Sequence, residues 1–364
     1  MSRATQFNDL PSGALARIAR FATAAPGARG FSLTCKANLH ACLATCPTLV
    51  LQLNSTKVSR LLSPAVLGVL RARKQPLQLQ LLWNMEGQQH SIPDMLRFVI
   101  GLLRGCTSVH EVVLGGLAVE HAELGTWLGA TLADSFPNLD SLTLAGGVGY
   151  EGLARLLSDP ALKALALHLD ISQAFVYSPG AAAFYREAVS LSSLHMGNLD
   201  SPGESLQDMS CNWRSLRAGQ ADMVALSQLP SHAVRGDVHI ACMKVVARAD
   251  DLDAIAAAAL CFAVGVPVRP KVDRLHIDIV GTSDEELAVL AAVHPLQGCI
   301  RVVEAWCGDW ALEDDTQAFY VDVMEALLPV CKGCSELRIW RAPPQPNLEM
   351  WQAPAVVMTF GPCA

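Results

Sequence analysis

The sequence is poor in charged and aromatic residues. Of its 364 residues, 17% are charged and 6% are aromatic, while 51% are hydrophobic. A chain this apolar can fill a long core, and so little charge excludes an intrinsically disordered protein. The net charge of -7 also argues against nucleic acid as the main partner, because neutralising phosphates requires clustered Lys and Arg.

Long apolar runs are missing as well. The longest, Ile255–Val268, is interrupted by Pro267 and is shorter than the roughly 20 residues of a membrane-spanning helix. Met1–Leu10 contains Arg3 and Asp9 and has no apolar stretch typical of a secretory signal. We therefore expect an intracellular protein, in the cytoplasm or nucleus, that does not act at a membrane.

Motifs for catalysis or metal binding are also scarce. The sequence contains no G-x-S-x-G elbow, H-E-x-x-H pair, P-loop or kinase signature. Its twelve cysteines are scattered, and a chain of this length needs no disulfides, so free thiols are expected. Cys331-x-x-Cys334 has the spacing of a zinc or redox site, but no second pair or nearby His pair completes a tetrahedral set. We expect no catalytic residue, metal or cofactor.

One motif leaves an enzyme alternative open. Gly147–Gly152 reads G-x-G-x-x-G, follows a strand-like stretch ending at Leu144, precedes a helical pattern, and has Asp170 about 20 residues further on. These are the ingredients of the dinucleotide-binding turn of an NAD-dependent oxidoreductase. The same apolar pattern occurs before and after this segment without the glycines. A glycine-rich turn within one repeat is therefore the favoured interpretation.

The sequence is rich in one short apolar phrase, which returns at intervals of roughly 20 to 40 residues, as in a solenoid. Its clearest copies are Leu139/Leu142/Leu144, Leu162/Leu165/Leu167, Leu191/Leu194/Met196 and Val272/Leu275/Ile277, and weaker ones include Val112, Leu216, Val238, Val303 and Leu337. The two-residue alternation predicts a short strand at each copy, often followed by a helix. Glycine is expected in the turn after the strand, at Gly146, Gly197, Gly219 and Gly281.

The L-x-x-L-x-L spacing resembles the leucine-rich-repeat family, in particular its irregular, cysteine-containing type, over residues 48–342. The Asn or Cys that normally follows the phrase is mostly missing. The resemblance implies an α/β solenoid, with a curved parallel sheet and helices on its convex side. Residues 343–364 would form a C-terminal cap or tail.

Residues 1–47 carry a different pattern. A Leu-Pro pair precedes one amphipathic helical stretch, and an L-x-C-K segment opens a second. Directly before repeats, this arrangement resembles an F-box, a small all-α segment that docks on a Skp-type adaptor and its cullin scaffold. The residues implied in docking are Leu10, Pro11, Leu15, Ile18, Leu33, Cys35, Lys36 and Leu39. The resemblance implies the substrate-recognition subunit of a cullin-RING (SCF-type) ubiquitin ligase. The alternative is a leucine-rich-repeat binding scaffold whose N-terminal helices only cap the solenoid.

Strand alternation predicts which side chains would face a target protein. Stacking the phrases in register places Ala166 beside Thr143, His239 beside His276, and Trp306 beside Trp340 on the concave face. The predicted target-binding residues are His195, Arg217, His239, His276, Glu304, Trp306, Arg338 and Trp340. Two adjacent tryptophans among charged residues have the composition of a binding hot spot.

Overall fold

The computed structural model is an α/β protein with a large, mostly parallel sheet and helices. It describes residues 43–53, 62–83, 92–116, 122–177, 181–199, 213–224, 234–264, 270–279, 284–307, 316–341 and 356–360. The chain divides into two compact units, Met1–Glu187 and Ala188–Ala364. No helix in the described ranges is long and apolar enough to cross a membrane.

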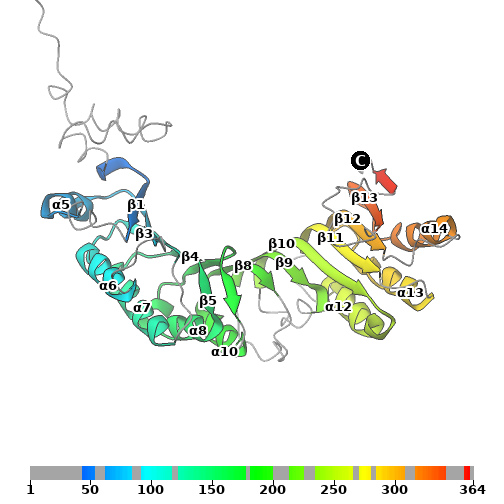
Figure 1. Ribbon diagram of the computed structural model, residues 1–364, viewed down its shortest axis with the longest axis horizontal. Helices are drawn as coiled ribbons and strands as arrows, with labels where there is room; N and C mark the ends of the chain where they lie inside the picture. The colour runs from blue at the N-terminus through cyan, green and yellow to red at the C-terminus, as the bar shows by residue number, and fades with distance from the viewer. Residues whose placement is uncertain are drawn as a thin grey trace, which may run out of the picture. The chain divides into compact units, whose positions relative to one another are not determined.

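The first unit contains a parallel sheet whose strands lie side by side in chain order (Figure 1). Its strands are β1 (Thr48–Gln52), β2 (Leu77–Leu82), β3 (Val109–Gly115), β4 (Ser141–Ala145) and β6 (His168–Ile171). The helices on one face of this sheet are α5 (Pro64–Ala72), α6 (Ile92–Leu103), α7 (Ala122–Ser135), α8 (Tyr150–Leu157), α9 (Pro160–Lys163) and α10 (Ala181–Glu187). A short 3-10 helix, η2 (Ala188–Ser190), begins the second unit.

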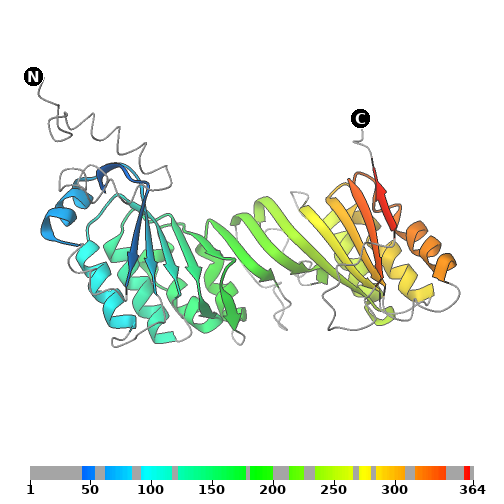
Figure 2. The same ribbon diagram turned by 45° about the horizontal axis from the view of Figure 1, so that its top comes forward.

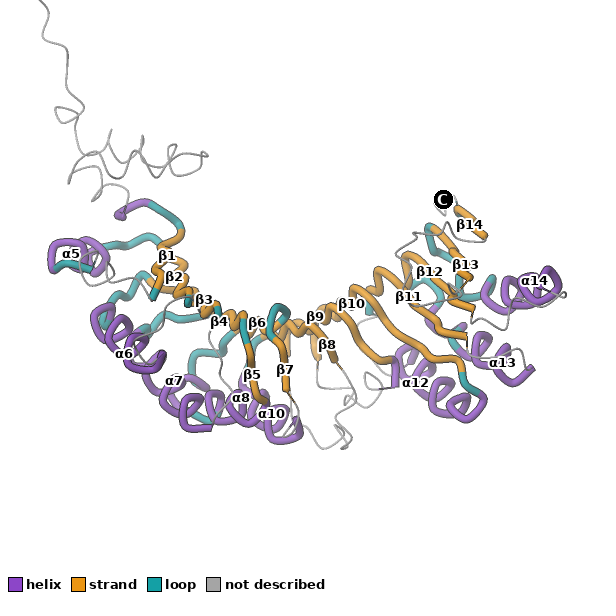
Figure 3. Tube along the Cα trace, in the orientation of Figure 1, coloured by secondary structure: helices purple, strands orange, loops and turns teal. Residues whose placement is uncertain are grey.

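The second unit repeats this arrangement, as Figure 2 shows. Its strands, in sheet order, are β8 (Ser193–Leu199), β9 (Trp213–Asp222), β10 (Val234–Ala247), β11 (Lys271–Ile279), β12 (Ile300–Cys307), β13 (Glu336–Arg341) and β14 (Val356–Thr359). All adjacent pairs are parallel except β13 and β14. Helices α12 (Leu252–Val264), α13 (Asp284–Ala292) and α14 (Thr316–Leu327), with η4 (Ala249–Asp251) and η5 (His294–Leu296), connect the strands, and the three α-helices lie on one face (Figure 3).

The repeated apolar phrase supplies the core of both units. Its strand positions, such as Leu142, Leu194, Leu275, Val303 and Leu337, are fully buried. The helices add apolar side chains to this core from the face that packs on the sheet, because residues spaced about one helical turn apart lie on the same side. Strands such as β2, β4 and β8 thus alternate between buried side chains on one face and more exposed side chains on the other.

For one copy of the apolar phrase, the strand predicted from the sequence is wrong. Leu162 lies in α9, and the strand begins only at His168, so that Leu142 pairs with Leu169 and Thr143 with Asp170. Asp159 explains the difference, because its carboxylate caps α9 by accepting hydrogen bonds from two backbone amides. Ala166 is therefore not a strand residue beside Thr143; it lies in the connection, with a left-handed φ of 49°.

Two glycines expected in turns lie within strands. Gly197 belongs to β8 and Gly219 to β9, and both strands continue beyond them. A Cβ on Gly219 would lie 2.8 Å from the carbonyl oxygen of Gly197. The glycines are thus explained by close approach of two backbones. Gly146 follows β4 as predicted, and Gly281 lies outside the described residues.

The G-x-G-x-x-G segment is not a turn. Gly147–Gly149 forms strand β5, which pairs in parallel with β7 (Phe175–Tyr177), and α8 begins at the next residue. Gly152 lies in α8, and a Cβ on Gly125 of α7 would collide with its backbone carbonyl. Among the described strands of the first unit, the chain order shows no reversal, which a dinucleotide site at a switch point requires.

Candidate functional site

The sheet face opposite the helices carries the polar side chains of the second unit. We call it the polar face, and on β8–β13 it comprises His195, Arg217, His239, Lys244, Lys271, Arg274, His276, Asp278, Glu304, Trp306, Glu336, Arg338 and Trp340. All eight residues predicted to bind a target lie on this face. Their predicted role in binding stays a prediction.

The register divides the predicted row in two. His239 pairs with Lys271, and His276 pairs with Lys244, so His239 and His276 are not neighbours. The cause is the length of β10, which has 14 residues and carries buried residues at both Val238-x-Ile240 and Met243-x-Val245. The strand β11 aligns its own phrase with the second set, because Leu275 pairs with Met243.

Two rows of side chains result. The lower row crosses β8–β11 and consists of His195, Arg217, His239 and Lys271. The upper row crosses β10–β13 and consists of Lys244, His276, Glu304 and Arg338. Along β10 the rows are five residues apart, which is about 16 Å at the rise of an extended strand.

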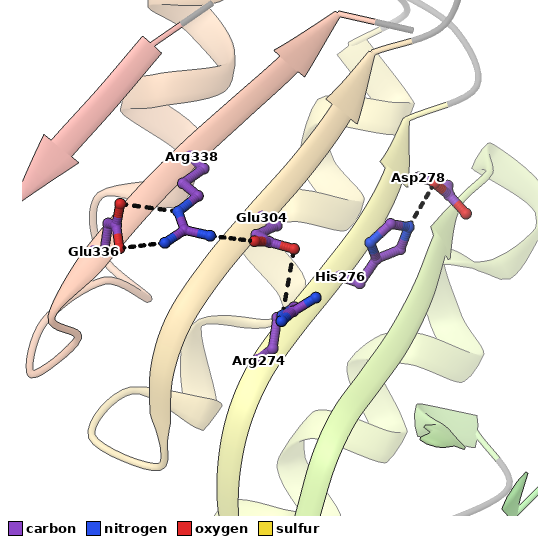
Figure 4. A network of polar contacts seen from close by, with 6 residues as sticks. All are labelled: Arg274, His276, Asp278, Glu304, Glu336 and Arg338. Atoms are coloured by element: carbon purple, nitrogen blue, oxygen red, sulfur yellow. Dashed lines mark hydrogen bonds and ion pairs between the residues drawn. The ribbon is translucent and has the colours of Figure 1, made fainter. Parts of the chain in front are cut away.

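The upper row contains a charge network centred on Glu304 (Figure 4). The Glu304 side chain is only 5% exposed, and it accepts a hydrogen bond of 3.0 Å from Arg338. Arg274 approaches its second carboxylate oxygen from the other side at 3.5 Å, with 54% of the Arg274 side chain exposed. A nearly buried carboxylate is thus held between two guanidinium groups, which offset the cost of removing it from water.

Arg338 is shared by two carboxylates. It donates two hydrogen bonds of 2.8 Å to Glu336, in addition to the bond to Glu304. This two-pronged hydrogen bond lowers the pKa of the Glu336 carboxyl below its ordinary value and raises the pKa of Arg338. The fixed guanidinium geometry explains why Arg, rather than Lys, suits this position.

Trp306 and Trp340 lie side by side at the carboxyl ends of β12 and β13, as the sequence predicts. They pair in register, and their rings stack with centroids 5.2 Å apart and an interplanar angle of 12°. His276 contacts the Trp306 ring at 5.7 Å and shares a hydrogen bond of 2.9 Å with Asp278. Within the described ranges, both indole nitrogens are buried without a hydrogen-bond partner. The pair is therefore held by stacking and packing.

Several partners in this network escaped sequence-based prediction. Arg274 and Glu336 are polar-face residues two positions from a predicted residue in the same strand, and Lys244 lies between the buried Met243 and Val245. The two-residue period would have identified Arg274 from His276, and Glu336 from Arg338. Lys244 required the true register of β10, which the apolar spacing alone does not determine.

Cys331 and Cys334 are buried in the connection between α14 and β13. The hydrogen bond between the two thiols and burial raise the pKa of Cys331. Burial also raises the pKa of Cys307 to about 12, so its thiol stays protonated at neutral pH. The described part of the chain contains no group of three or more His, Cys, Asp or Glu arranged to hold a metal ion.

The predicted adaptor-binding residues, Leu10 to Leu39, lie outside the described residues, as does most of 343–364. The described end of the chain supplies β14, which pairs antiparallel with β13. A comparison of the chain with models of known protein families gives no match, and a comparison with curated proteins gives none either.

Proposed function

We propose that the chain is a leucine-rich-repeat solenoid that binds a target protein on the polar face. Support comes from the succession of strands in chain order within each unit, the helices on a single face, and the buried L-x-x-L-x-L positions. This architecture leaves a row of alternate side chains available on every strand.

The observation that carries the proposal is the stacked Trp306/Trp340 pair beside the Glu304 network. Protein-binding hot spots are enriched in Trp and Arg, whose large rigid groups are surrounded by contacts that exclude water. Here Arg338 is already held by two carboxylates, so little of its side-chain entropy remains to be lost when a partner binds.

We further propose that the chain serves as the substrate-recognition subunit of a cullin-RING ubiquitin ligase, in the cytoplasm or nucleus. The proposal rests on the F-box-like pattern of residues 1–47 directly before the repeats. In that role the adaptor-bound N-terminus brings the target close to the charged ubiquitin conjugate and raises its effective concentration.

Arg73 joins Leu43, near the end of the N-terminal segment, to the residues that follow α5. Its guanidinium is buried and donates to the carbonyl oxygens of Leu43 at 2.7 Å, Gln75 at 2.8 Å and Pro76 at 3.0 Å. Leu43 belongs to the last residues of the F-box-like segment. These bonds fix the described end of the F-box-like segment against the residues that follow α5.

The ligase role is tested by capturing a purified Skp-type adaptor with the full chain. The matched variant carries Leu10→Ala, Pro11→Ala and Leu15→Ala, with folding checked by circular dichroism. Stoichiometric capture by the wild type, lost in the variant, supports the receptor role. If neither protein captures the adaptor, the ligase role fails and a binding scaffold remains.

The binding face is tested separately by crosslinking in an extract of the source cells. Trp340→Ala is compared with Trp127→Ala, which removes a tryptophan that lies on α7 beneath Arg97 at 5.0 Å. Loss of a crosslinked protein with Trp340→Ala alone supports the polar face as the target site. Loss with both variants, or with neither, contradicts it.

A further inference from the structure

The lower row of the polar face and the adjacent strand starts concentrate positive charge. Arg217 and Lys271 are exposed members of the lower row, two strands apart. Arg214, Arg235 and Arg301 are exposed at the starts of β9, β10 and β12. The first two are brought together because β10 begins in register with β9, Val234 pairing with Trp213.

Most of the carboxylates on and beside the polar face are engaged by partners. Asp273 contacts His239 at 3.0 Å, Asp278 contacts His276, and Glu304 and Glu336 are held by arginine. Asp222 at the end of β9 accepts a hydrogen bond from the amide of Val224, and Asp237 is the exposed carboxylate near the lower row.

Three positively charged side chains of the polar face, unlike these carboxylates, lack an ion-pair partner in the described part of the chain. The side chains of Arg217, Lys244 and Lys271 form no ion pair or hydrogen bond with other residues in the described ranges. Two of them are in the lower row and one begins the upper row. The charge left for a partner on the polar face is therefore positive, although the whole chain carries a net charge of -7.

The spacing of these cations suits an extended peptide. Arg217 and Lys271 are separated by two strand intervals, about 10 Å. This matches residues i and i+3 of an extended chain of the polyproline II type, whose three-residue period puts both side chains on one side. Carboxylates at that spacing on a partner would each meet one cation. A continuous phosphate backbone is a poorer fit, because the far ends of the strands are followed by exposed acids at Asp250, Asp253 and Asp284.

We propose that the lower row binds an extended, Asp/Glu-rich segment of the target protein. This inference rests on the proposed target-binding function and names the chemistry of the target. Acidic side chains would pair with Arg217 and Lys271 and approach Arg214, Arg235 and Arg301 at the strand starts. Charge complementarity of this kind accelerates association and selects among partners.

The test uses a fluorescein-labelled peptide of about ten residues rich in Glu, titrated with the full chain at low and physiological salt. The variant Arg217→Glu/Lys271→Glu is compared with Lys74→Glu/Arg155→Glu, which makes the same charge change at exposed positions of the first unit. Folding of both is checked by thermal unfolding. We expect salt-sensitive binding by the wild type, weakened about tenfold or more in the first variant and less than about twofold in the second.

Three results would overturn the inference: no binding of the peptide by the wild type, equal loss in both variants, or tighter binding of a ten-nucleotide RNA that depends on the same two residues. The last would identify a nucleic-acid surface. None of these results touches the adaptor capture or the Trp340 crosslink, so a failure of this inference is distinguishable from a failure of the proposed function.

Discussion

Replacing Glu304 with Gln should destabilise the second unit by about 1 to 2 kcal/mol. The substitution preserves shape and one acceptor, but it removes the charge that strengthens the bond from Arg338 and turns an amide donor toward Arg274. Because one third of the Arg338 side chain remains exposed, water screens part of the interaction, and the full cost of breaking a buried ion pair is not expected.

Arg338 and Arg274 should differ in how strongly they couple to Glu304, and this difference tests the reasoning more sharply than the single variant does. In double-mutant cycles with Glu304→Gln, Arg338→Met should show a coupling energy of about 1 to 2 kcal/mol. Arg274→Met should show about 0.5 kcal/mol or less, since Arg274 is 54% exposed and lies 3.5 Å away.

The assay is equilibrium unfolding in urea, followed by circular dichroism, for the single and double variants. Unchanged stability of Glu304→Gln, or equal coupling to both arginines, would refute the reasoning that burial and hydrogen-bond geometry set the strength of this network.

Three other expectations concern the same fold. The hydrogen bonds from Arg338 lower the pKa of Glu336 from 4.5, so this carboxylate stabilises the folded state fully above pH 4.5 and loses that contribution as the pH falls through its folded-state pKa. Between pH 5 and 3, the melting temperature should therefore fall more for the wild type than for Glu336→Gln. The stacked rings should give Trp306→Ala and Trp340→Ala a coupling energy of about 1 kcal/mol in urea unfolding, whereas additive effects would contradict the stack. Gly125→Ala should lower the free energy of unfolding by about 1 to 3 kcal/mol, because the new Cβ would collide with α8. Gly101→Ala, which has open space around it, should be neutral or stabilising; calorimetric melting of both variants checks the difference.

The apolar phrase predicted strands and buried positions well, because alternation along a strand decides which side chains can leave water. It also predicted the Trp306/Trp340 contact, since β12 and β13 carry single copies of the phrase that align directly. It misplaced Leu162, because a capped helical turn presents apolar residues at similar spacing. The role of the N-terminal segment stays a prediction, based on sequence alone.

The sequence by itself determined the kind of architecture: a repeating apolar spacing that forms α/β units around a mostly parallel sheet, with polar side chains on the face opposite the helices. Only the tertiary structure decided the register, and the register decided the site. Because β10 carries two buried sets, a five-residue offset puts Lys244 beside His276 and Lys271 beside His239. The burial of Glu304 between two arginines follows from three strands meeting in space, which no spacing along one chain encodes.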